Sequence, residues 1–481
     1  MDQLVATNIA QLEVDAITQS LFRSWDELFG MERPEVEAFQ LRAVKQRLEF
    51  LAPRVSVLAS QMESSGVTRI ESLNDVAPLL FQHTVYKSYP ISLVENNRFD
   101  LLTRWLAGVT SIDLSGVDAT HCTGIDDWLG LLEQTTSLKP FHTSGTSGKL
   151  SFFPRTSLES DLWGHHTLKR FEGFGEEPGE KVGFDGVRVP CIIARPRHGR
   201  YTAQRLNQFY AEHLAPTPDQ LYTMTDGTLS ADLAALSGRV RMAQAKGELS
   251  SMQLSETMRI AFKRYLVELE NRPREVTTFL GRIVDELRGQ RVFLNGPTEG
   301  LLQAAQFAAE RGLSGVFASN SLMMMSVIGG GEVKDAKANA LSGDWLQQIK
   351  TFTGVSSAVF AYGMTEITGM MPMCNECNYH IPPFFIPYLL DPRSGQLLPR
   401  TGTQTGRFAC MDLLPSSYWG GIVSGDKVTI EWDRSCACGR KGAHIHHDVT
   451  RYSAEVTGDD KITCAATVDN TDVALQQLLA L

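Results

Sequence analysis

The sequence predicts an α/β fold in which sheets and helices form layers. Short apolar runs typical of buried strands, such as residues 187–194 and 292–295, alternate with longer segments of helical periodicity, such as residues 298–312. The 481 residues are 43% hydrophobic and 21% charged, which is ordinary for a globular chain with a sizeable core. This alternation of strands and helices is the pattern of layered α/β domains.

The first 66 residues are expected to form a helical extension. Pro34, followed by acidic residues, suits the first turn of a helix, and residues 36–52 carry apolar side chains at helical spacing. Further helices are expected at residues 157–168, 203–215, 228–246, 258–271, 274–289 and 298–312, and further short apolar runs occupy residues 315–318 and 323–328.

Composition and charge argue against several classes of function. The formal net charge of −10 disfavours a general nucleic-acid or anionic-membrane surface. No apolar run is long enough to span a membrane, and the acidic start of the chain does not resemble a secretory signal. Four of the eight cysteines fall in two close pairs, which favours thiol or metal chemistry in a reducing, cytoplasmic compartment.

A loop rich in glycine and hydroxyl groups lies within residues 141–154 (FHTSGTSGKLSFFP). Glycines allow a close backbone approach, N–H and hydroxyl groups can surround an anion, and a lysine adds positive charge. The spacing differs from a Walker A loop, so the composition predicts another kind of phosphate-binding loop, with a solvated turn as the alternative. Its residues are Thr143, Ser144, Gly145, Thr146, Ser147, Gly148 and Lys149.

Two later motifs follow this loop: residues 360–366 read FAYGMTE and residues 423–427 read VSGDK. The three motifs in this order resemble the adenylate-forming superfamily, whose members make acyl-AMP from a carboxylic acid and ATP. Lys149 directly after the second glycine, and SCACGR at residues 435–440, resemble the phenylacetate–CoA ligase branch. The resemblance spans roughly residues 70–479 and implies the adenylate-forming fold, with a large domain over residues 67–450.

The resemblance implies a role for each motif residue. Tyr362 and Gly363 would border the adenine, with the tyrosine ring stacked on it, and Thr365 would lie near the phosphates. Glu366 would hold Mg²⁺, which prefers carboxylate and phosphate oxygens. Asp426 would accept hydrogen bonds from the ribose hydroxyls. A simple hairpin turn is the alternative for the Gly-Asp pair. Together with Lys149, the residues Thr365 and Glu366 form the expected catalytic set.

Two further stretches are ambiguous. Gly330, Gly331 and Glu332 correspond by resemblance to the backbone that wraps the adenine, although three glycines after a strand also suit a turn. His165 and His166 are expected on a helix that flanks the acyl pocket in the family, where packing is a simpler role than catalysis.

Four cysteines and a histidine have the spacing of a metal site. Cys374, Cys377 and His380 follow one another at two-residue gaps, and Cys436 and Cys438 come about 60 residues later. A hairpin-like return that joins the two groups would give a tetrahedral, structural zinc site. Five candidates for four places leave one spare, expected to be Cys374 or Cys377, and reduced cysteines without metal are the alternative.

The end of the chain departs from the family. Residues 458–462 (GDDKI) resemble the hinge before a mobile C-terminal domain, but Thr457 stands where a hinge arginine is expected, with Arg451 or Arg440 as substitutes. Residues 451–481 are therefore expected to form a truncated C-terminal domain. The family's late catalytic lysine has no counterpart, which leaves the use of CoA open.

The expected function is ATP-dependent activation of a carboxylic acid, followed by transfer to CoA, an amine or a partner protein. The branch favours an aromatic acid and a role in small-molecule biosynthesis, and a homodimer is left open. One alternative is transfer of a fatty acyl group through Cys464, as in acyl-protein synthetases. Another is a homologue that binds nucleotide or acid without turnover.

Overall fold

The computed structural model describes residues 23–143, 149–174, 186–252, 254, 256–325, 344–452 and 475. The chain forms two compact units. The first unit comprises Met1–Phe141, Ser151–Thr167 and Tyr362–Ile462, and the second comprises His142–Leu150, Leu168–Ala361 and Thr463–Leu481. The domain boundaries expected near residues 66 and 450 stay predictions.

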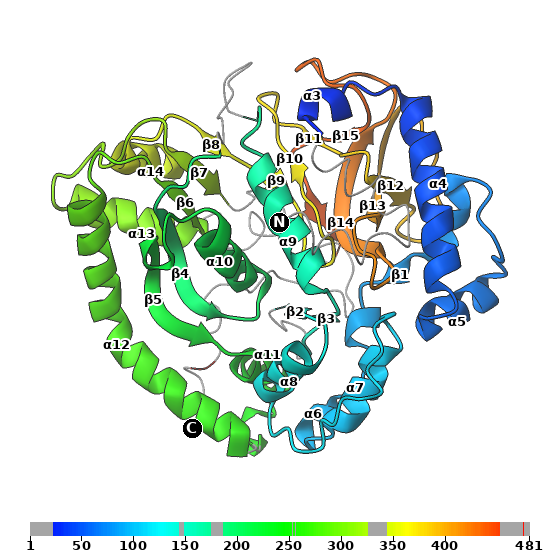
Figure 1. Ribbon diagram of the computed structural model, residues 1–481, viewed down its shortest axis with the longest axis horizontal. Coiled ribbons are helices and arrows are strands. Elements are labelled where there is room, and N and C mark those ends of the chain that lie inside the picture. The colour runs from blue at the N-terminus through cyan, green and yellow to red at the C-terminus, as the bar shows by residue number, and fades with distance from the viewer. Residues whose placement is uncertain are drawn as a thin grey trace. The chain divides into compact units, whose positions relative to one another are not determined.

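A mainly antiparallel sheet forms the centre of the first unit, with β11, β15, β14, β13 and β12 in that order (Figure 1). The long strand β14 also pairs with β1, in parallel, and with β16. Every residue of β12, which pairs antiparallel with β13, is buried. The strands are β1 (Phe81–Gln82), β11 (Tyr379–His380), β12 (Phe385–Leu390), β13 (Thr403–Asp412), β14 (Gly421–Glu431), β15 (His444–Ile445) and β16 (Thr450–Arg451).

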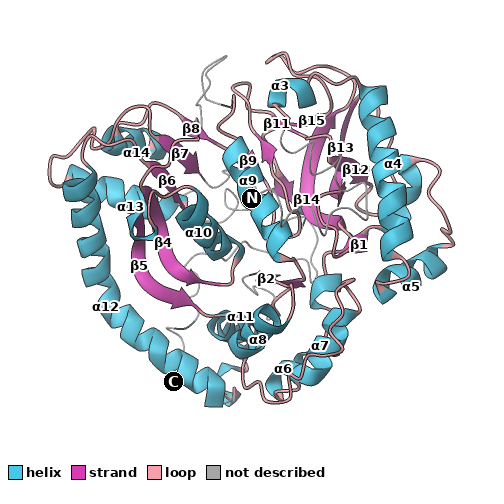
Figure 2. Ribbon diagram, in the orientation of Figure 1, coloured by secondary structure: helices cyan, strands magenta, loops and turns pink. Residues whose placement is uncertain are grey.

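Helices precede and flank this sheet in the first unit (Figure 2). The first described helix has a capping box at its N-terminus. The Ser24 side chain accepts a hydrogen bond from the Glu27 N–H, and the Glu27 side chain accepts one from the Ser24 N–H. Pro34 lies in the first turn of the next helix, as predicted. The helices are α3 (Trp25–Leu28), α4 (Arg33–Leu51), α5 (Ser56–Ser65), η1 (Leu73–Leu79), η2 (Val85–Lys87), α6 (Ile91–Glu95), α7 (Phe99–Ala107), α8 (Ile125–Thr135) and α9 (Ser157–Lys169).

The second unit contains a parallel sheet with strand order β5, β4, β6, β7, β8. All residues of β6 and β7 are buried, as expected for parallel strands covered on both faces. The strands are β4 (Cys191–Gly199), β5 (Leu221–Leu229), β6 (Phe293–Gly296), β7 (Leu322–Met325) and β8 (Ala358–Val359). Two small sheets, of β2 (Phe141–His142) with β3 (Phe152–Phe153) and of β9 (Ala361–Tyr362) with β10 (Met371–Pro372), complete the described strands. The predicted α/β class is therefore confirmed.

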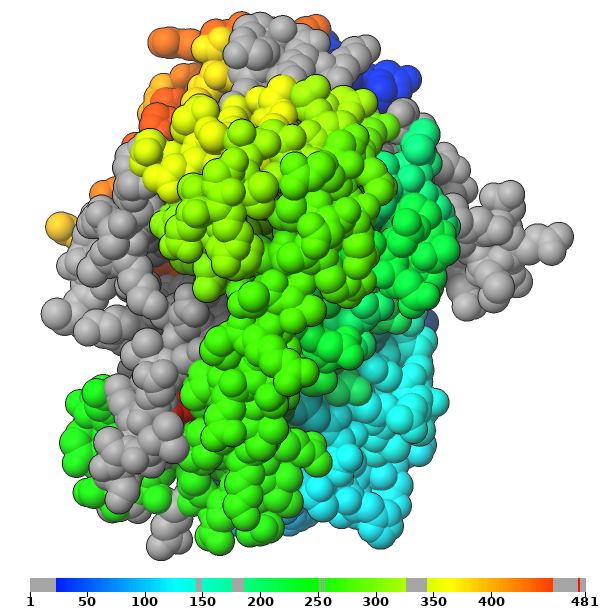
Figure 3. All heavy atoms as spheres, turned by 90° about the vertical axis from the view of Figure 1, so that its left-hand side faces the viewer, coloured from blue at the N-terminus to red at the C-terminus, as the bar shows by residue number. Residues whose placement is uncertain are grey.

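Helices of the second unit pack along its strands, with α10 against β4 and α12 against β5. The space-filling view shows α12 on the surface of this unit (Figure 3). Leu475 is fully buried and packs with Leu233, Leu236 and Tyr265 of α11 and α12. The helices are α10 (Thr202–His213), η3 (Pro218–Gln220), α11 (Ala231–Lys246), η4 (Leu249–Ser251), α12 (Glu256–Leu287), α13 (Thr298–Ala309) and α14 (Trp345–Thr353).

Three expected elements differ from the structure. Two helices were expected on either side of Pro273, yet α12 continues through this proline, which lacks an N–H but does not end the helix. The strand expected over residues 187–194 begins only at Cys191 and runs on to Gly199. The helix expected from residue 228 begins at Ala231, where the Ser230 side chain caps it. Among the described residues, no helix is long and apolar enough to cross a membrane.

Candidate active site

The structure describes part of the predicted site. Thr143 and Lys149 belong to the second unit, and the predicted residues from Tyr362 onward that are described belong to the first. The following predicted residues lie outside the described part of the chain: Ser144, Gly145, Thr146, Ser147, Gly148, Gly330, Gly331, Glu332 and Cys464.

Tyr362 and Asp426 meet in the first unit. The Tyr362 hydroxyl donates a 2.6 Å hydrogen bond to Oδ2 of Asp426, and both side chains are buried. The tyrosine ring packs between Tyr379 and Phe408, with ring centroids 5.9 and 5.6 Å away. Residues from the second and third predicted motifs are thus joined directly.

Arg451 completes this group. Because β16 pairs with β14 so that Arg451 lies opposite Asp426, the arginine Nε comes within 3.2 Å of Asp426 Oδ1. The alternative from the sequence, Arg440, instead lies beside the cysteine cluster, where its Nη1 is 3.5 Å from Cys438 Sγ. Of the two arginines, Arg451 is therefore the one that neighbours Asp426.

Glu366 lies in the same electrostatic environment. Its side chain is half-buried, and desolvation raises the pKa of its carboxyl. The positive charges of Arg451 and Arg155 lower that pKa, whereas the Asp426 carboxylate raises it further. At Gly363, a β-carbon would come within 2.9 Å of the Met370 side chain, so a larger residue would have to displace that side chain. The motif therefore places a partly desolvated carboxylate near a second carboxylate and two cations.

Arg155 holds the motif backbone in place. This fully buried side chain donates from Nη2 to the carbonyl oxygens of Thr365 and Ile367, at 2.7 and 2.6 Å, and from Nε to the Tyr418 hydroxyl. Since these hydrogen bonds go to the motif backbone and to a phenol, Arg155 acts as a positioning residue. Arg155 directly follows the glycine-rich stretch of residues 141–154, and its buried bracing role could not be predicted from the sequence.

Two buried groups near this region have structural roles. His166 is buried, and its Nε2 lies 2.7 Å from the Met370 carbonyl oxygen, which supports the packing role expected for the histidine pair. Asp412, which the sequence did not single out, is fully buried on β13 and accepts hydrogen bonds from the N–H groups of Thr368 and Leu414. Burial raises the pKa of Asp412 to about 6.

Lys149 is half-buried, and desolvation lowers the pKa of its ammonium group. A partly desolvated lysine binds an anion more strongly than one in bulk water, because the surrounding dielectric is lower. The side chain therefore has the character that a phosphate ligand needs.

A second cluster in the first unit consists of Cys374, His380, Cys436 and Cys438. Their ligand atoms all lie within 4.8 Å of one another. The pairing of β11 with β15 and the turn of residues 436–439 bring them together, as the predicted hairpin-like return requires. Cys377 is exposed and sits on a turn with φ of 56°, so it is the spare residue of the two that the sequence left open.

The geometry of this cluster fits zinc. Around a tetrahedral zinc with Zn–S bonds near 2.3 Å, two ligand sulfurs lie about 3.8 Å apart. The Cys374 and Cys436 sulfurs are 3.8 Å apart, and Cys438 Sγ is 3.3 Å from His380 Nε2. Hydrogen bonds from Cys374 and His380 lower the pKa of the Cys438 thiol, which favours the thiolate that binds metal. Three thiols and one imidazole are a structural zinc ligand set.

No family model matches the chain, and no curated protein matches it in sequence. Similar solved structures include 2-hydroxyisobutyryl-CoA ligase with 2-HIB-AMP and CoA (TM-score 0.47, 12% identity, 88% of this chain and 76% of that chain). They also include the luciferase-like enzyme of the mealworm Zophobas morio (TM-score 0.33, 12% identity, 65% and 56%). ATP-bound MatB from Rhodopseudomonas palustris is a third (TM-score 0.31, 14% identity, 64% of this chain and 46% of that chain).

Proposed function

We propose that this chain activates a carboxylic acid as acyl-AMP at the expense of ATP and passes the acyl group to a nucleophile. The observation that carries the proposal is the meeting of Tyr362, Asp426 and Arg451, with Glu366 electrostatically coupled to them. Residues from two separate motifs of the adenylate-forming pattern are thereby combined in one polar group. A carboxylate braced by a phenol and a guanidinium is suited to accept hydrogen bonds from a sugar diol.

Each residue has a distinct task in this proposal. Asp426 binds the ribose hydroxyls, and Tyr362 orients Asp426 through its 2.6 Å hydrogen bond while flanking the adenine with its ring. Arg451 neutralises Asp426, so that this carboxylate does not repel the nucleotide. Arg155 acts indirectly, because it fixes the backbone on which Thr365 and Glu366 are carried.

The reaction brings a substrate carboxylate onto a polyanion, so positive charge at the phosphates lowers its barrier. Glu366 is proposed as the ligand of Mg²⁺, a fit that rests on its half-buried carboxylate and on the preference of this ion for oxygen ligands. When bound, Mg²⁺ would neutralise developing charge on the phosphates. Thr143, Lys149 and the loop between them are proposed to bind the phosphates, with Lys149 supplying a fixed positive charge.

The Cys374, His380, Cys436 and Cys438 cluster is proposed to hold a structural zinc ion. All four positions of a tetrahedral site are filled by side chains, so no position is left for water or substrate. Its role would be to tie β11 to the turn of residues 436–439. Reduced thiols of this kind suit the cytoplasm.

The substrate is proposed to be an aromatic acid of small-molecule biosynthesis, as the phenylacetate–CoA ligase resemblance suggests, with CoA, an amine or a partner protein as acceptor. Pyrophosphate exchange screened over aromatic and fatty acids, with each acceptor then added in turn, tests both the reaction and its substrates. Acid-dependent exchange supports the proposal. Nucleotide binding without exchange on any acid would instead support a binding protein without turnover.

A further inference from the structure

The parallel sheet of the second unit has a switch point between β4 and β6. The chain goes from β4 outward to β5 and then returns to the other side of β4 to form β6, so that connections leave these neighbours in opposite directions (Figure 1). In sheets of this order, ligands bind outside the carboxyl ends of the strands at the switch point. The two strands approach closely there, because a β-carbon on Gly296 would come within 2.7 Å of Ala194 Cβ.

Arg195 bridges the switch point. It is the central residue of β4, two positions beyond the last residue that pairs with β6, and its Nη2 donates to Oδ1 of Asn295 near the end of β6. Its Nε donates to Oδ1 of Asn207 on α10, at 3.0 Å. Asn207 is fully buried and is itself fixed, because its Nδ2 donates to the carbonyl oxygens of Pro196 and Arg197. Two buried amides therefore hold the guanidinium in one orientation.

The strand is shaped to present this side chain. The register of β4 against β5 shifts between Ile193 and Pro196 and again between Pro196 and His198. Such irregularities turn side chains away from their regular direction and are common beside binding sites. Arg195 is only half-buried, and its Nη1 has no hydrogen bond to a described residue yet is not enclosed. This nitrogen remains available to a ligand.

The charge of Arg195 is balanced by dipoles alone within the described part of the chain. Its hydrogen-bond partners are neutral amides, and no described carboxylate forms an ion pair with it. Burial lowers the pKa of its guanidinium to about 10, so it is still charged at neutral pH, and the phenol of Tyr210 opposes this shift. A desolvated cation without a counter-ion is costly unless an anion is supplied.

A second guanidinium adds to the positive potential of this region. Arg170 is buried, and its Nη2 contacts the sulfur of Met324 on β7. Arg170 and Arg195 share Tyr210 as an electrostatic neighbour, and the Tyr210 hydroxyl also lies 3.8 Å from the Met324 sulfur. Both arginines therefore lie close to the same phenol.

We propose that Arg195, braced by Asn207 and Asn295, forms a binding site for an oxyanion at the β4/β6 switch point. The ligand would carry a carboxylate or a phosphate group, whose oxygens match the N–H groups of a guanidinium. The neutral amide of Asn295 is central to this argument. An aspartate at the same position would supply a counter-ion to Arg195 from within the chain, whereas an asparagine does not. The site would bind its anion whether or not the chain makes acyl-AMP.

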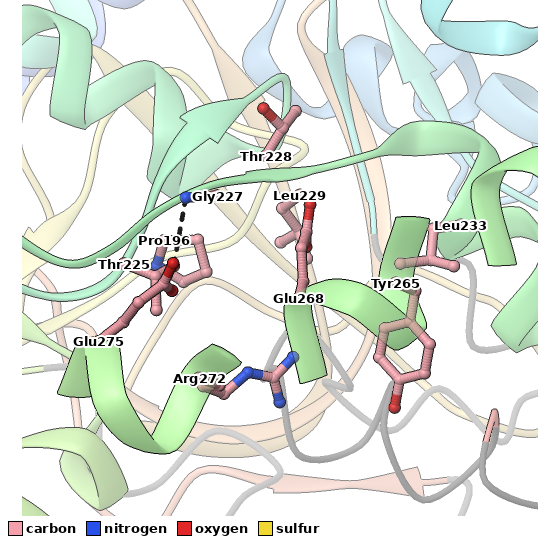
Figure 4. Close-up of a pocket in the computed structure, with 10 residues that line it drawn as sticks. All are labelled: Pro196, Thr225, Gly227, Thr228, Leu229, Leu233, Tyr265, Glu268, Arg272 and Glu275. Carbon is pink, nitrogen blue, oxygen red and sulfur yellow. Dashed lines mark hydrogen bonds between the residues drawn. The ribbon is translucent and has the colours of Figure 1, made fainter. Parts of the chain in front are cut away.

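This site is separate from the cavity that α12 covers in the same unit. That cavity lies between α12 and the ends of β4 and β5 (Figure 4). Glu268, Arg272 and Glu275 line it from the helix, so it carries its own negative charge. Burial and Glu275 raise the pKa of Glu268, while Arg272 opposes them. Neither Arg195 nor its amide partners line this cavity.

The test measures binding of inorganic phosphate and of succinate to the full chain by calorimetry, at constant ionic strength. The wild type should bind at least one of them saturably. Arg195→Gln should weaken that binding at least tenfold. Asn295→Asp should weaken it by a similar factor. Because the aspartate still accepts a hydrogen bond from Arg195, this second variant keeps the test valid if Arg195→Gln does not fold. Saturation by phosphate alone would assign a phosphate ligand, and saturation by succinate alone a carboxylate; either supports the site.

Two further variants serve as controls. Arg197→Gln removes a neighbouring arginine of β4 that bonds to the carbonyl oxygens of Leu221 and Pro218, and it should change anion affinity less than twofold. Lys149→Ala separates the two proposals: anion binding that is lost in this variant but kept in Arg195→Gln would belong to the proposed nucleotide loop and would count against the switch-point site. Absence of saturable binding of both probes to the wild type would overturn the proposal, as would equal binding by the wild type and both switch-point variants.

Discussion

The Tyr362 hydroxyl and Asp426 Oδ2 lie 2.6 Å apart, although 64 positions separate the two residues. This contact links the strand that carries the Tyr-Gly-Met-Thr-Glu motif to β14, which carries the Gly-Asp pair. Because Arg451 approaches the other oxygen of Asp426 from β16, the carboxylate is held from two sides. These two contacts fix its orientation, which would reduce the entropy lost in the proposed nucleotide binding.

Tyr362→Phe tests this contact. The variant leaves one oxygen of a buried carboxylate without its donor, and hydrogen bonds to charged groups contribute about 1.5–3 kcal/mol. We therefore expect KM for ATP in acid-dependent pyrophosphate exchange to rise about tenfold or more, with a smaller change in kcat. The control is Tyr379→Phe, which alters the neighbouring ring 5.9 Å away and should leave KM for ATP nearly unchanged. Equal effects of the two substitutions would contradict the orienting role.

Glu366→Gln tests the proposed ligand of Mg²⁺. The amide keeps the size of the side chain but removes the charge that a hard cation requires. Pyrophosphate exchange should fall by about 100-fold or more, which is the typical loss when one electrostatic contributor is removed. The exposed Glu376→Gln, ten residues along the same unit, should be nearly neutral. An exchange rate near that of the wild type in Glu366→Gln would sink the assignment.

The zinc site predicts about one zinc ion per purified chain. Replacing Cys436 and Cys438 together by serine should remove the ion and lower Tm, because structural zinc contributes to folding. Cys377→Ser is the matched control, since the structure leaves this exposed cysteine outside the cluster, and it should retain both the ion and the wild-type Tm. Elemental analysis that finds no zinc in carefully prepared wild-type protein would count decisively against the site.

Much of this fold and site could be predicted because the signals are local. Residues 157–168 and 298–312 have helical periodicity and form α9 and α13. The cysteine and histidine spacing predicted a cluster that the structure assembles, apart from Cys377. The order of the motifs identified Tyr362 and Asp426 as site residues from the sequence alone, and the structure shows that they are in contact.

The remaining features depend on packing between distant segments. The choice of Arg451 over Arg440 follows from the register of β16 on β14, which sequence spacing does not set. Arg195 and Asn295 are 100 positions apart and belong to no motif, so only the strand order brings them together. Pro273 signals a helix end locally, but the tertiary contacts of α12 override this preference.

Lys149→Ala tests the phosphate-binding role of the loop. Loss of one positive group at the phosphates typically costs about 100- to 1,000-fold in rate, so single-turnover formation of acyl-AMP should fall into this range. ATP binding, measured by calorimetry, should weaken less, because the charge matters most when the carboxylate attacks. Lys263→Ala, on the exposed side of α12, is the control and should leave both unchanged. A loss below about tenfold in Lys149→Ala would show that another group provides this charge.

Asp412 should make stability depend on pH in a direction that is unusual for a carboxylate. Burial raises its pKa from 3.8 to about 6, although the N–H groups of Thr368 and Leu414 and the charges of Arg155 and Arg47 oppose the shift. Between these two pKa values the folded chain holds a proton that the unfolded chain releases. The contribution of Asp412 to the free energy of unfolding is therefore favourable at low pH and is lost as the pH rises through about 6.

A shift of about 2 pH units at 1.36 kcal/mol each corresponds to about 3 kcal/mol. Urea unfolding of the wild type and of Asp412→Asn between pH 4 and pH 7 measures this term, because the variant cannot titrate. The wild type should lose about 2 kcal/mol relative to the variant across this range, because part of the proton release from the unfolded chain occurs below pH 4. Asp391→Asn serves as a control for the sign, since hydrogen bonds from Ser394 lower the pKa of Asp391 and its contribution is lost as the pH falls. If the difference between the wild type and Asp412→Asn stays constant from pH 4 to pH 7, Asp412 is ionised throughout and the burial argument is wrong.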